Sequence, residues 1–413
     1  MRGMLKGGRA FPLVKAPNRT PMNARAFANP DERLCQFVGM LDGCLFLSYL
    51  LGFEQAYFYA VSIGIKLLAV GYLRSKPTGF VSSSVPFLLL LLAAETASSV
   101  LNELEPLAFL RVIVFALNIL ATMNFICRAY WNGLFLANVG NASIYLVMLQ
   151  VGSIENAFGR YFYYNLAHPN LGSELFFGAS FAGLLSQRYK QVLFLMPLIF
   201  VPVFMMQGRA AELGIAAVAI LCGIQVFWRL SPSSQAVLFV VAAISVAVLL
   251  LWLDVGSLLN KLLLLDDKYR GQGTDASGRS GYWAAAIQVW IDHPIFGAGS
   301  SYPSRLGVPQ AHNFFLYALA DYGLIGIALI VVLVVQLGSV IAAGYWPFVL
   351  PLVPMLIFND RFINLNTYPT VMFLFVFAYF ATTRRSTRIV GSSHSAMSGS
   401  RVGVTAEQPK TMT

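Results

Sequence analysis

The chain has 413 residues, of which 57% are hydrophobic and only 11% are charged. Soluble domains average about 25% charged residues, so this composition excludes an ordinary soluble protein. The formal net charge of +10 does not indicate a nucleic-acid partner, because much of it lies in the two chain ends, residues 1–35 and 384–413. Both ends are rich in Ser, Gly, Pro, Thr and Asn. We expect them to be disordered basic tails on the cytoplasmic side of a membrane.

Apolar runs of about 17–20 residues, long enough to cross about 30 Å of hydrocarbon, recur between the tails. Residues 36–383 are therefore predicted to form one all-α polytopic membrane domain with about 12 transmembrane helices. The expected spans are 36–53, 55–73, 84–101, 107–127, 133–152, 171–187, 190–206, 209–228, 235–253, 312–342, 345–358 and 369–383. The tenth is too long for one straight span, so we expect it to project beyond the bilayer or to tilt strongly.

The charges between the spans favour one topology. With the N-terminus inside, the short inner loops are basic and the short outer loops are acidic, which is the positive-inside pattern. The basic positions are Arg74, Lys76, Arg128, Arg188, Lys190 and Arg229, and the acidic ones are Glu54, Glu103 and Glu105. An even number of spans places both termini in the cytoplasm. The same count places the large loop 254–311, between the ninth and tenth spans, outside the cytoplasm. It also places on that side Arg160, His168, Arg209, Arg279, His312 and Arg361.

The large loop carries one predicted helix. Residues 282–291 have the pattern of an amphipathic helix, and Trp283 and Trp290 could rest at the membrane interface. Pro294 and the glycines that follow it should end this helix.

His312 and Asn313 stand directly before the tenth span. An Asn in this position can cap the helix, and an imidazole can take up a proton near neutral pH. The alternative is an interfacial histidine with no chemical role. Arg279, in the large loop, has a guanidinium suited to paired hydrogen bonds with phosphate oxygens, or it is a solvated loop residue.

Other ionisable residues near the spans leave two interpretations open. Arg209 could face the bundle interior, or it could snorkel and pair with Glu212. Asp321, inside the tenth span, could orient a neighbouring Arg or Tyr, or it could be exposed. His168 could line an outer cavity or belong to a plain turn.

Four further charged positions are less informative. Lys66 can snorkel towards the inner surface, and Glu95 receives no partner from the sequence. Asp266 and Asp267 could be ligands for Mg²⁺ or Mn²⁺, but Lys268 and its neighbours favour a solvated charge cluster.

Several short motifs stand in a fixed order between residues 266 and 326. They are Asp-Asp-Lys-Tyr-Arg-Gly at 266–271, Gly-Arg at 278–279, Trp283, Pro294 with Gly297 and Gly299, His312-Asn313, and Asp-Tyr-Gly-Leu-Ile-Gly at 321–326. In order and spacing this series resembles the O-antigen ligase and polymerase superfamily of bacterial envelope proteins. The helical layout with one large outer loop extends the resemblance over most of the chain.

The resemblance implies a metal-independent, inverting glycosyltransferase without a cofactor, located in the bacterial inner membrane with its active site facing the periplasm. The donor would be a glycan linked to undecaprenyl diphosphate, and the acceptor another lipid-linked glycan or the lipid A core. By motif, the catalytic positions are His312, Arg279 and Arg209, the last within Gly-Arg-Ala at 208–210, where the family often has Ser-Arg-Gly. Asp321 stands where the family usually has Glu.

Residues around these positions are expected to hold the substrate. The candidates are Arg270, Asn313, Asp321, Trp283, Arg160, His168 and Arg361. Membrane lipids, a chain-length regulator and export proteins are further expected partners, and no metal site is expected.

Four activities remain to be weighed. Residues 270–279 look more like those of exopolysaccharide polymerases than those of lipid A core ligases, which favours polymerisation, and ligation is the alternative. A flippase or transporter for lipid-linked oligosaccharides would suit twelve spans, but no two-fold repetition is visible. A metal-dependent membrane glycosyltransferase would usually place acidic ligands in the first outer loop, which here holds little more than Glu54.

Overall fold

The computed structural model describes residues 32–52, 55–73, 81–101, 106–157, 160–164, 168–252, 279–299, 302–358 and 369–380. Within these ranges the regular structure is helical apart from one short antiparallel hairpin, in which β1 (Asn156–Ala157) pairs with β2 (Arg160–Tyr161). The predicted all-α class is confirmed for this part of the chain, with the hairpin as a small departure. Both expected tails lie almost wholly outside the described residues.

Helical segments coincide with each expected span. They are α1 (Glu32–Gly43), α2 (Phe46–Leu51), α3 (Gln55–Leu73), α4 (Val81–Leu101), α5 (Pro106–Thr122), α6 (Arg128–Gln150), α7 (Pro169–Ser186), α8 (Tyr189–Met206), α9 (Arg209–Phe227), α10 (Pro232–Trp252), α14 (Phe314–Val340), α15 (Trp346–Val349), α16 (Val353–Phe358) and a last helix at Pro369–Phe380. The large loop contributes α12 (Arg279–Asp292) and α13 (Tyr302–Leu306).

Five helical stretches in the described part are long and apolar enough to cross a membrane. They are Glu32–Leu51, Arg128–Gln150, Tyr189–Met206, Arg209–Phe227 and Phe314–Phe358. The chain is therefore a multi-pass helical membrane protein. The full number of spans and the side on which each loop lies stay predictions.

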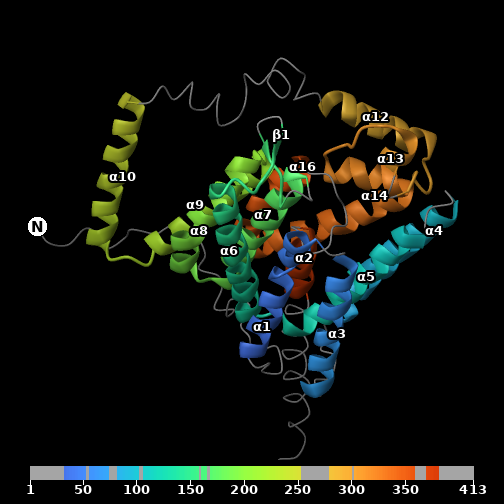
Figure 1. Ribbon diagram of the computed structural model, residues 1–413, viewed down its shortest axis with the longest axis horizontal. Helices are drawn as coiled ribbons and strands as arrows, with labels where there is room; N and C mark the ends of the chain where they lie inside the picture. Colours follow the sequence, from blue (N-terminus) through green and yellow to red (C-terminus); the bar gives the residue numbers. More distant parts are fainter. Residues whose placement is uncertain are drawn as a thin grey trace, which may run out of the picture.

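Helix α7 is the centre of the bundle. Every residue from Gly172 to Ser186 is buried, and the helix packs against α6, α8 and α9 (Figure 1). Because a helix buried on all sides is held by all its neighbours, α7 fixes the positions of these three helices at both of its ends.

Glycines bring α1 and α6 into backbone contact. A Cβ atom at Gly39 would lie 2.0 Å from the carbonyl oxygen of Tyr130, and one at Gly133 would lie 2.1 Å from that of Gln36. Gly39 and Gly43 are four residues apart on α1, which is the small-residue spacing that lets membrane helices approach closely. A methyl group at any of these positions would push the helices apart.

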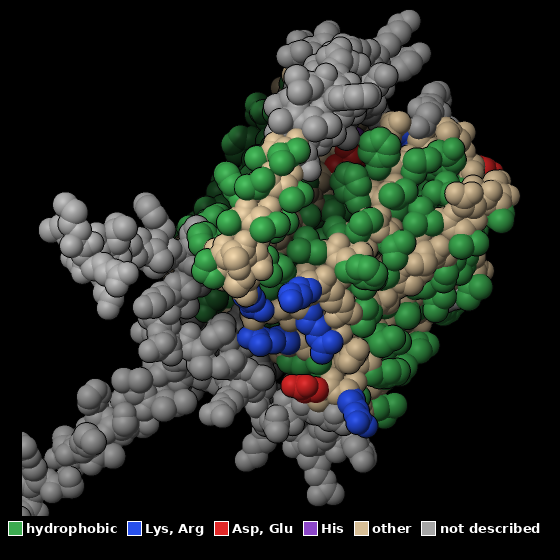
Figure 2. All heavy atoms as spheres, turned by 90° about the vertical axis from the view of Figure 1, so that its left-hand side faces the viewer, with side chains coloured by type: hydrophobic (Ala, Val, Ile, Leu, Met, Phe, Trp, Pro, Cys, Tyr) green, Lys and Arg blue, Asp and Glu red, His purple; other side chains and the backbone are tan. Residues whose placement is uncertain are grey.

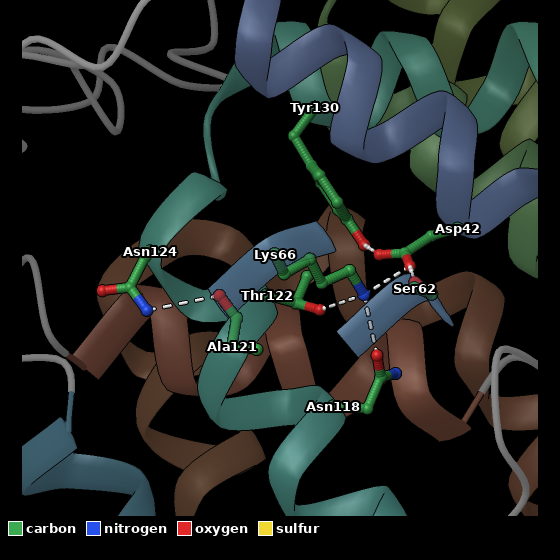
Figure 3. A network of polar contacts seen from close by, with 8 residues as sticks. All are labelled: Asp42, Ser62, Lys66, Asn118, Ala121, Thr122, Asn124 and Tyr130. Carbon is green, nitrogen blue, oxygen red and sulfur yellow. Dashed lines mark hydrogen bonds and ion pairs between the residues drawn. The ribbon is translucent and has the colours of Figure 1, made fainter. Parts of the chain in front are cut away.

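A buried polar network joins the N-terminal helices (Figure 3). The Lys66 side chain on α3 is 0% exposed and forms an ion pair with Asp42 on α1. Its ammonium group also donates to Asn118 Oδ1 at 2.7 Å and to Thr122 Oγ1 at 2.8 Å, both on α5. The snorkelling expected for Lys66 is therefore wrong, because an acid on a neighbouring helix lies within reach of its ammonium group.

The carboxylate of Asp42 has two further partners. The hydroxyl of Ser62 donates to Oδ1 at 3.2 Å, and the hydroxyl of Tyr130 donates to Oδ2 at 2.9 Å. The network thus connects α1, α3, α5 and α6 through charges that have no solvent to compensate them.

The expected tenth span is not one straight helix, because its backbone is broken. At Gly323 the backbone of α14 leaves helical geometry, with φ 58° and ψ −132°. A π-helical turn at Ile341–Tyr345 follows, with Gly344 at φ 86°. The long apolar stretch is therefore built from several short straight pieces.

The elements near the candidate site gather at one end of the molecule. Figure 1 shows the hairpin, α16 and α12 at the end opposite the start of α1. This is the end that the charge pattern predicts to lie outside the cytoplasm.

Candidate functional site

His312 lies in the turn between α13 and α14, half-buried, with its backbone in the left-handed region at φ 47°. For a non-glycine residue this conformation costs about 1–2 kcal/mol, and such strain often occurs where a side chain must be held for a function. The imidazole lies beside the Tyr282 ring of α12, with ring centroids 6.0 Å apart. The turn therefore aims His312 at α12.

Asn313 caps α14, as its sequence position predicts. Its Oδ1 accepts from the backbone N–H groups of Phe315 and Leu316, each at 3.0 Å. Its Nδ2 donates to the carbonyl of Ile357 at 3.1 Å. One side chain thus fixes the start of α14 and binds it to the end of α16.

Arg279 is the first residue of α12. The helix expected in the large loop is confirmed, and it begins three residues before the predicted position. Residues three apart share one face of a helix, so Arg279 stands on the face of α12 where Tyr282 meets His312. The side chain of Arg279 lies outside the described part of the structure.

The other predicted residues of the large loop divide between the described and undescribed parts. Trp283 and Trp290 are half-buried on α12, and their indole nitrogens are shielded from solvent. Arg270, Arg361 and the pair at 266–267 lie outside the described residues.

The segment after α12 replaces the helical hydrogen bonds lost at the break in α14. In an unbroken helix the N–H of Leu324 would bond to the carbonyl of Ala320. Here the Leu324 N–H donates to the Pro294 carbonyl at 2.9 Å, and the Ala320 carbonyl accepts from Ala298 N at 2.7 Å. The Asp321 carbonyl accepts from Gly299 N at 3.0 Å. Backbone hydrogen-bonding groups on both sides of the break therefore have partners, as an apolar environment requires.

Two glycines make this backbone pairing possible. Gly297 has φ 69°, and a Cβ atom there would lie 2.2 Å from the Asp321 carbonyl. Gly323 has φ 58°, and its Cβ atom would lie 2.6 Å from the Pro294 carbonyl. The motifs at 294–299 and 321–326, which carried the resemblance, are thus two halves of one junction between the large loop and α14.

Helix α4 supports the same junction from inside the bundle. The Tyr322 hydroxyl donates to Glu95 Oε2 at 2.8 Å, and Glu95 is 0% exposed. The Ser98 hydroxyl donates to the Asp321 carbonyl at 3.2 Å. Asp321 is itself only 2% exposed, so the alternative in which it is exposed is wrong.

A second group of predicted residues lies at the start of α7, the end of α8 and the start of α9. Arg160, on β2, is 7% exposed. Its Nε donates to the Met206 carbonyl at 2.9 Å and its Nη2 to Asn170 Oδ1 at 2.7 Å. His168 caps α7, with Nδ1 accepting from the Asn170 N–H at 3.2 Å. The hairpin therefore ties the last residue of α8 to the first turn of α7.

Arg209 begins α9 immediately beside these contacts. Glu212, one turn later, is 8% exposed and lies within electrostatic reach of both Arg209 and Arg160. A Cβ atom at Gly208 would lie 2.2 Å from Ser173 Oγ on α7. This explains the Gly that precedes Arg209 here, because a Ser at 208 would collide with Ser173.

Helix α16 connects the two groups. It packs against both α9 and α14, and Ile357 near its end accepts the bond from Asn313. The structure thus places the helix that starts at Arg209 and the helix that starts after His312 around one short element.

Sequence reasoning missed Tyr282 and the pairing of Glu95 with Tyr322. A carboxylate inside an apolar helix demands a partner, and that signal pointed to Glu95 without naming the tyrosine. Among the described residues, no group of three or more His, Cys, Asp or Glu is placed to hold a metal ion.

The described fold is that of a multi-pass helical membrane protein, with His312 just before α14 and Arg209 at the start of α9. Residues 192–331 match the family described as O-antigen ligase. The chain carries an O-antigen ligase family domain over these residues, and it is a glycosyltransferase-type enzyme of the ligase and polymerase kind. No curated protein matches the chain. The matched region runs from α8 into α14 and contains Arg209, Arg279 and His312.

Proposed function

We propose that this protein polymerises undecaprenyl-diphosphate-linked oligosaccharide repeat units into a surface or exopolysaccharide at the outer face of the inner membrane. The observation that carries the proposal is the placement of His312, held in a strained turn and aimed at the helix that begins with Arg279. A base and a phosphate-binding group on facing elements are what transfer from a diphosphate-linked sugar needs.

In the proposed reaction a hydroxyl oxygen of the acceptor attacks the anomeric carbon of the donor sugar. The bond between that carbon and the diphosphate oxygen breaks, and its electron pair leaves with the diphosphate. The hydroxyl proton passes to the imidazole of His312. Attack from the side opposite the leaving group inverts the anomeric centre.

The arginines act on the leaving group. Arg279 and Arg209 offset the negative charge that grows on the diphosphate, and fixed charges of this kind are worth most where water is excluded. Removing one such contact typically lowers the rate about 10²–10³-fold. A positioned general base contributes about 10²–10⁴-fold.

The acceptor separates polymerase from ligase. Residues 270–279 favour the polymerase, in which the acceptor is a second lipid-linked glycan. The alternative is O-antigen ligase activity, with the lipid A core as acceptor, and the family description supports it directly. In both cases the site faces the periplasm and both chain ends lie in the cytoplasm.

The test is reconstitution of the full chain in liposomes with lipid-linked repeat units, with and without lipid A core, and with a chelator in a parallel sample. We expect lengthening products without the lipid A core, and the same yield in the chelator. His312→Ala should lower the rate at least about 100-fold, and Arg279→Lys should lower it while keeping the charge.

His293→Ala is the matched control. His293 follows α12 directly and is half-buried like His312, but the proposal gives it no role, so its variant should keep its activity. Transfer that occurs only with lipid A core would make the protein a ligase. Undiminished activity in both His312→Ala and Arg279→Lys would remove the catalytic assignment.

A further inference from the structure

At the end of the molecule that the charge pattern predicts to be cytoplasmic, three arginines line a pocket of about 290 Å³. We call it the basic pocket and define it by Glu32, Arg128, Ala129, Ser186, Gln187, Arg188 and Arg229. Figure 2 shows Lys and Arg side chains gathered at the lower end of the molecule, beneath a mainly hydrophobic side.

The arginines come from three separate turns. Arg128 is the first residue of α6, Arg188 lies between α7 and α8, and Arg229 follows α9. They meet because α7 packs against α6, α8 and α9. Gln187 has φ 61°, which turns the chain sharply enough to bring Arg188 back over the pocket.

The pocket holds an excess of positive charge. Its lining has three guanidinium groups and one carboxylate, that of Glu32. Within the described part of the chain, neither Arg128 nor Arg188 has a hydrogen bond or an ion pair from its guanidinium group. The Arg229 guanidinium lies 5.1 Å from the centroid of the Tyr189 ring, which holds it in place without neutralising it.

Several guanidinium groups around one cavity suit the oxygens of a phosphate, because each can donate two parallel hydrogen bonds. Helices α6 and α8 also begin at this pocket, and the N-terminus of a helix favours an anion. The ligand chemistry is therefore a phosphate monoester or diester.

The surface beside the pocket indicates that the phosphate belongs to a lipid. Phe194 is 82% exposed on α8, and Leu198, Val201 and Phe204 continue an exposed apolar stripe along that helix. Phe194 and Leu198 follow the start of α8 at Tyr189 by five and nine residues, or about 8 and 14 Å at 1.5 Å per residue, which places them within the adjacent half of a bilayer core of about 30 Å. Trp228, 57% exposed and next to Arg229, has the position of an interfacial anchor.

We propose that the basic pocket binds the phosphate of an anionic phospholipid from the adjacent leaflet, with its acyl chains along the exposed face of α8. Clustered positive residues of inner loops are also expected from topology alone, but topology does not require three guanidinium groups around one shared cavity. This site lies at the opposite ends of α7, α8 and α9 from Arg160 and Arg209, so it is separate from the proposed catalytic residues.

The test uses the purified full chain in neutral detergent and measures its melting temperature with added lipid. Phosphatidylglycerol should raise it more than phosphatidylcholine does, and inorganic phosphate and glycerol phosphate at the same concentration should not. In Arg188→Gln/Arg229→Gln the apparent affinity for phosphatidylglycerol should fall about tenfold for each guanidinium removed.

Lys190→Gln is the matched control. Lys190 is exposed on the first turn of α8 and loses the same charge, but it does not line the pocket, so its variant should bind within about twofold of the parent. An equal response of the double variant and the parent would overturn the proposal. So would an equal response to both phospholipids. Stabilisation by inorganic phosphate alone would assign the pocket to a soluble phosphate. All three arginines are exposed, and a monodisperse profile for the double variant checks that it folds.

Discussion

Removing the charge of Lys66 should destabilise the protein far more than removing a neutral hydrogen-bond partner in the same buried network. In Lys66→Met the carboxylate of Asp42 stays buried, 3% exposed, with only the hydroxyls of Ser62 and Tyr130 as donors. Leaving one member of a buried ion pair alone typically costs about 3–5 kcal/mol.

The neutral bonds of the same network set the scale for comparison. Hydrogen bonds between membrane helices average about 0.6 kcal/mol, so Asn118→Leu and Thr122→Val should each lower the free energy of unfolding by about that amount. The double variant Asp42→Asn/Lys66→Met leaves no buried charge. It should therefore be less destabilised than the sum of its single variants, by roughly 2 kcal/mol or more.

The assay is unfolding in mixed micelles with a rising fraction of sodium dodecyl sulfate, followed by tryptophan fluorescence. Leu68→Met on the same helix is the control, because Leu68 is 75% exposed and its replacement should change stability by less than about 0.5 kcal/mol. The reasoning fails if Lys66→Met is no less stable than Asn118→Leu. It fails equally if the effects of the two charge changes simply add.

Two further predictions concern the junction beside the candidate site. Gly297→Ala should abolish transfer while the protein still folds, because its methyl group would lie 2.2 Å from the Asp321 carbonyl. Gly281→Ala is the control and should keep full activity, because a methyl group there would have nothing within 4 Å. Equal activity of the two variants in the liposome assay would show that the close approach has no role. Asn313→Ala should lower the free energy of unfolding by about 1 kcal/mol for the lost cap. Asn313→Ser should keep the cap and lose only the bond to Ile357, so it should be the more stable of the two. Melting curves that rank the two variants the other way would contradict the assignment of the cap to Asn313.

Local patterns in the sequence predicted what depends on neighbours along the chain. Apolar runs gave the helices, Asn313 was predicted as a cap, and the helix of the large loop was expected within three residues of its observed start at Arg279. These features follow from periodicity and capping, which act over a few residues.

Partnerships between distant helices could not be predicted in the same way. Tyr130 reaches Asp42 across 88 positions, and Tyr322 reaches Glu95 across 227. A buried charge in the sequence shows that a partner must exist, but only the packing of helices selects which one. The same limit applies to the break at Gly323, where a segment of the large loop forms the hydrogen bonds that the backbone N–H and carbonyl groups of α14 lack.

The packing also separates the roles of two arginines that the sequence placed together. Arg160 is 7% exposed, and two of its five N–H groups are directed to Met206 and Asn170. A guanidinium committed in this way suits positioning better than contact with a substrate, because binding a phosphate would break the bonds that hold α8 to α7. Arg209 follows Met206 by three residues and is partly exposed, so Arg160 fixes the turn from which Arg209 begins α9. In the proposed reaction we therefore assign the charge of the leaving diphosphate to Arg209, and to Arg160 the role of holding the turn from which Arg209 begins α9.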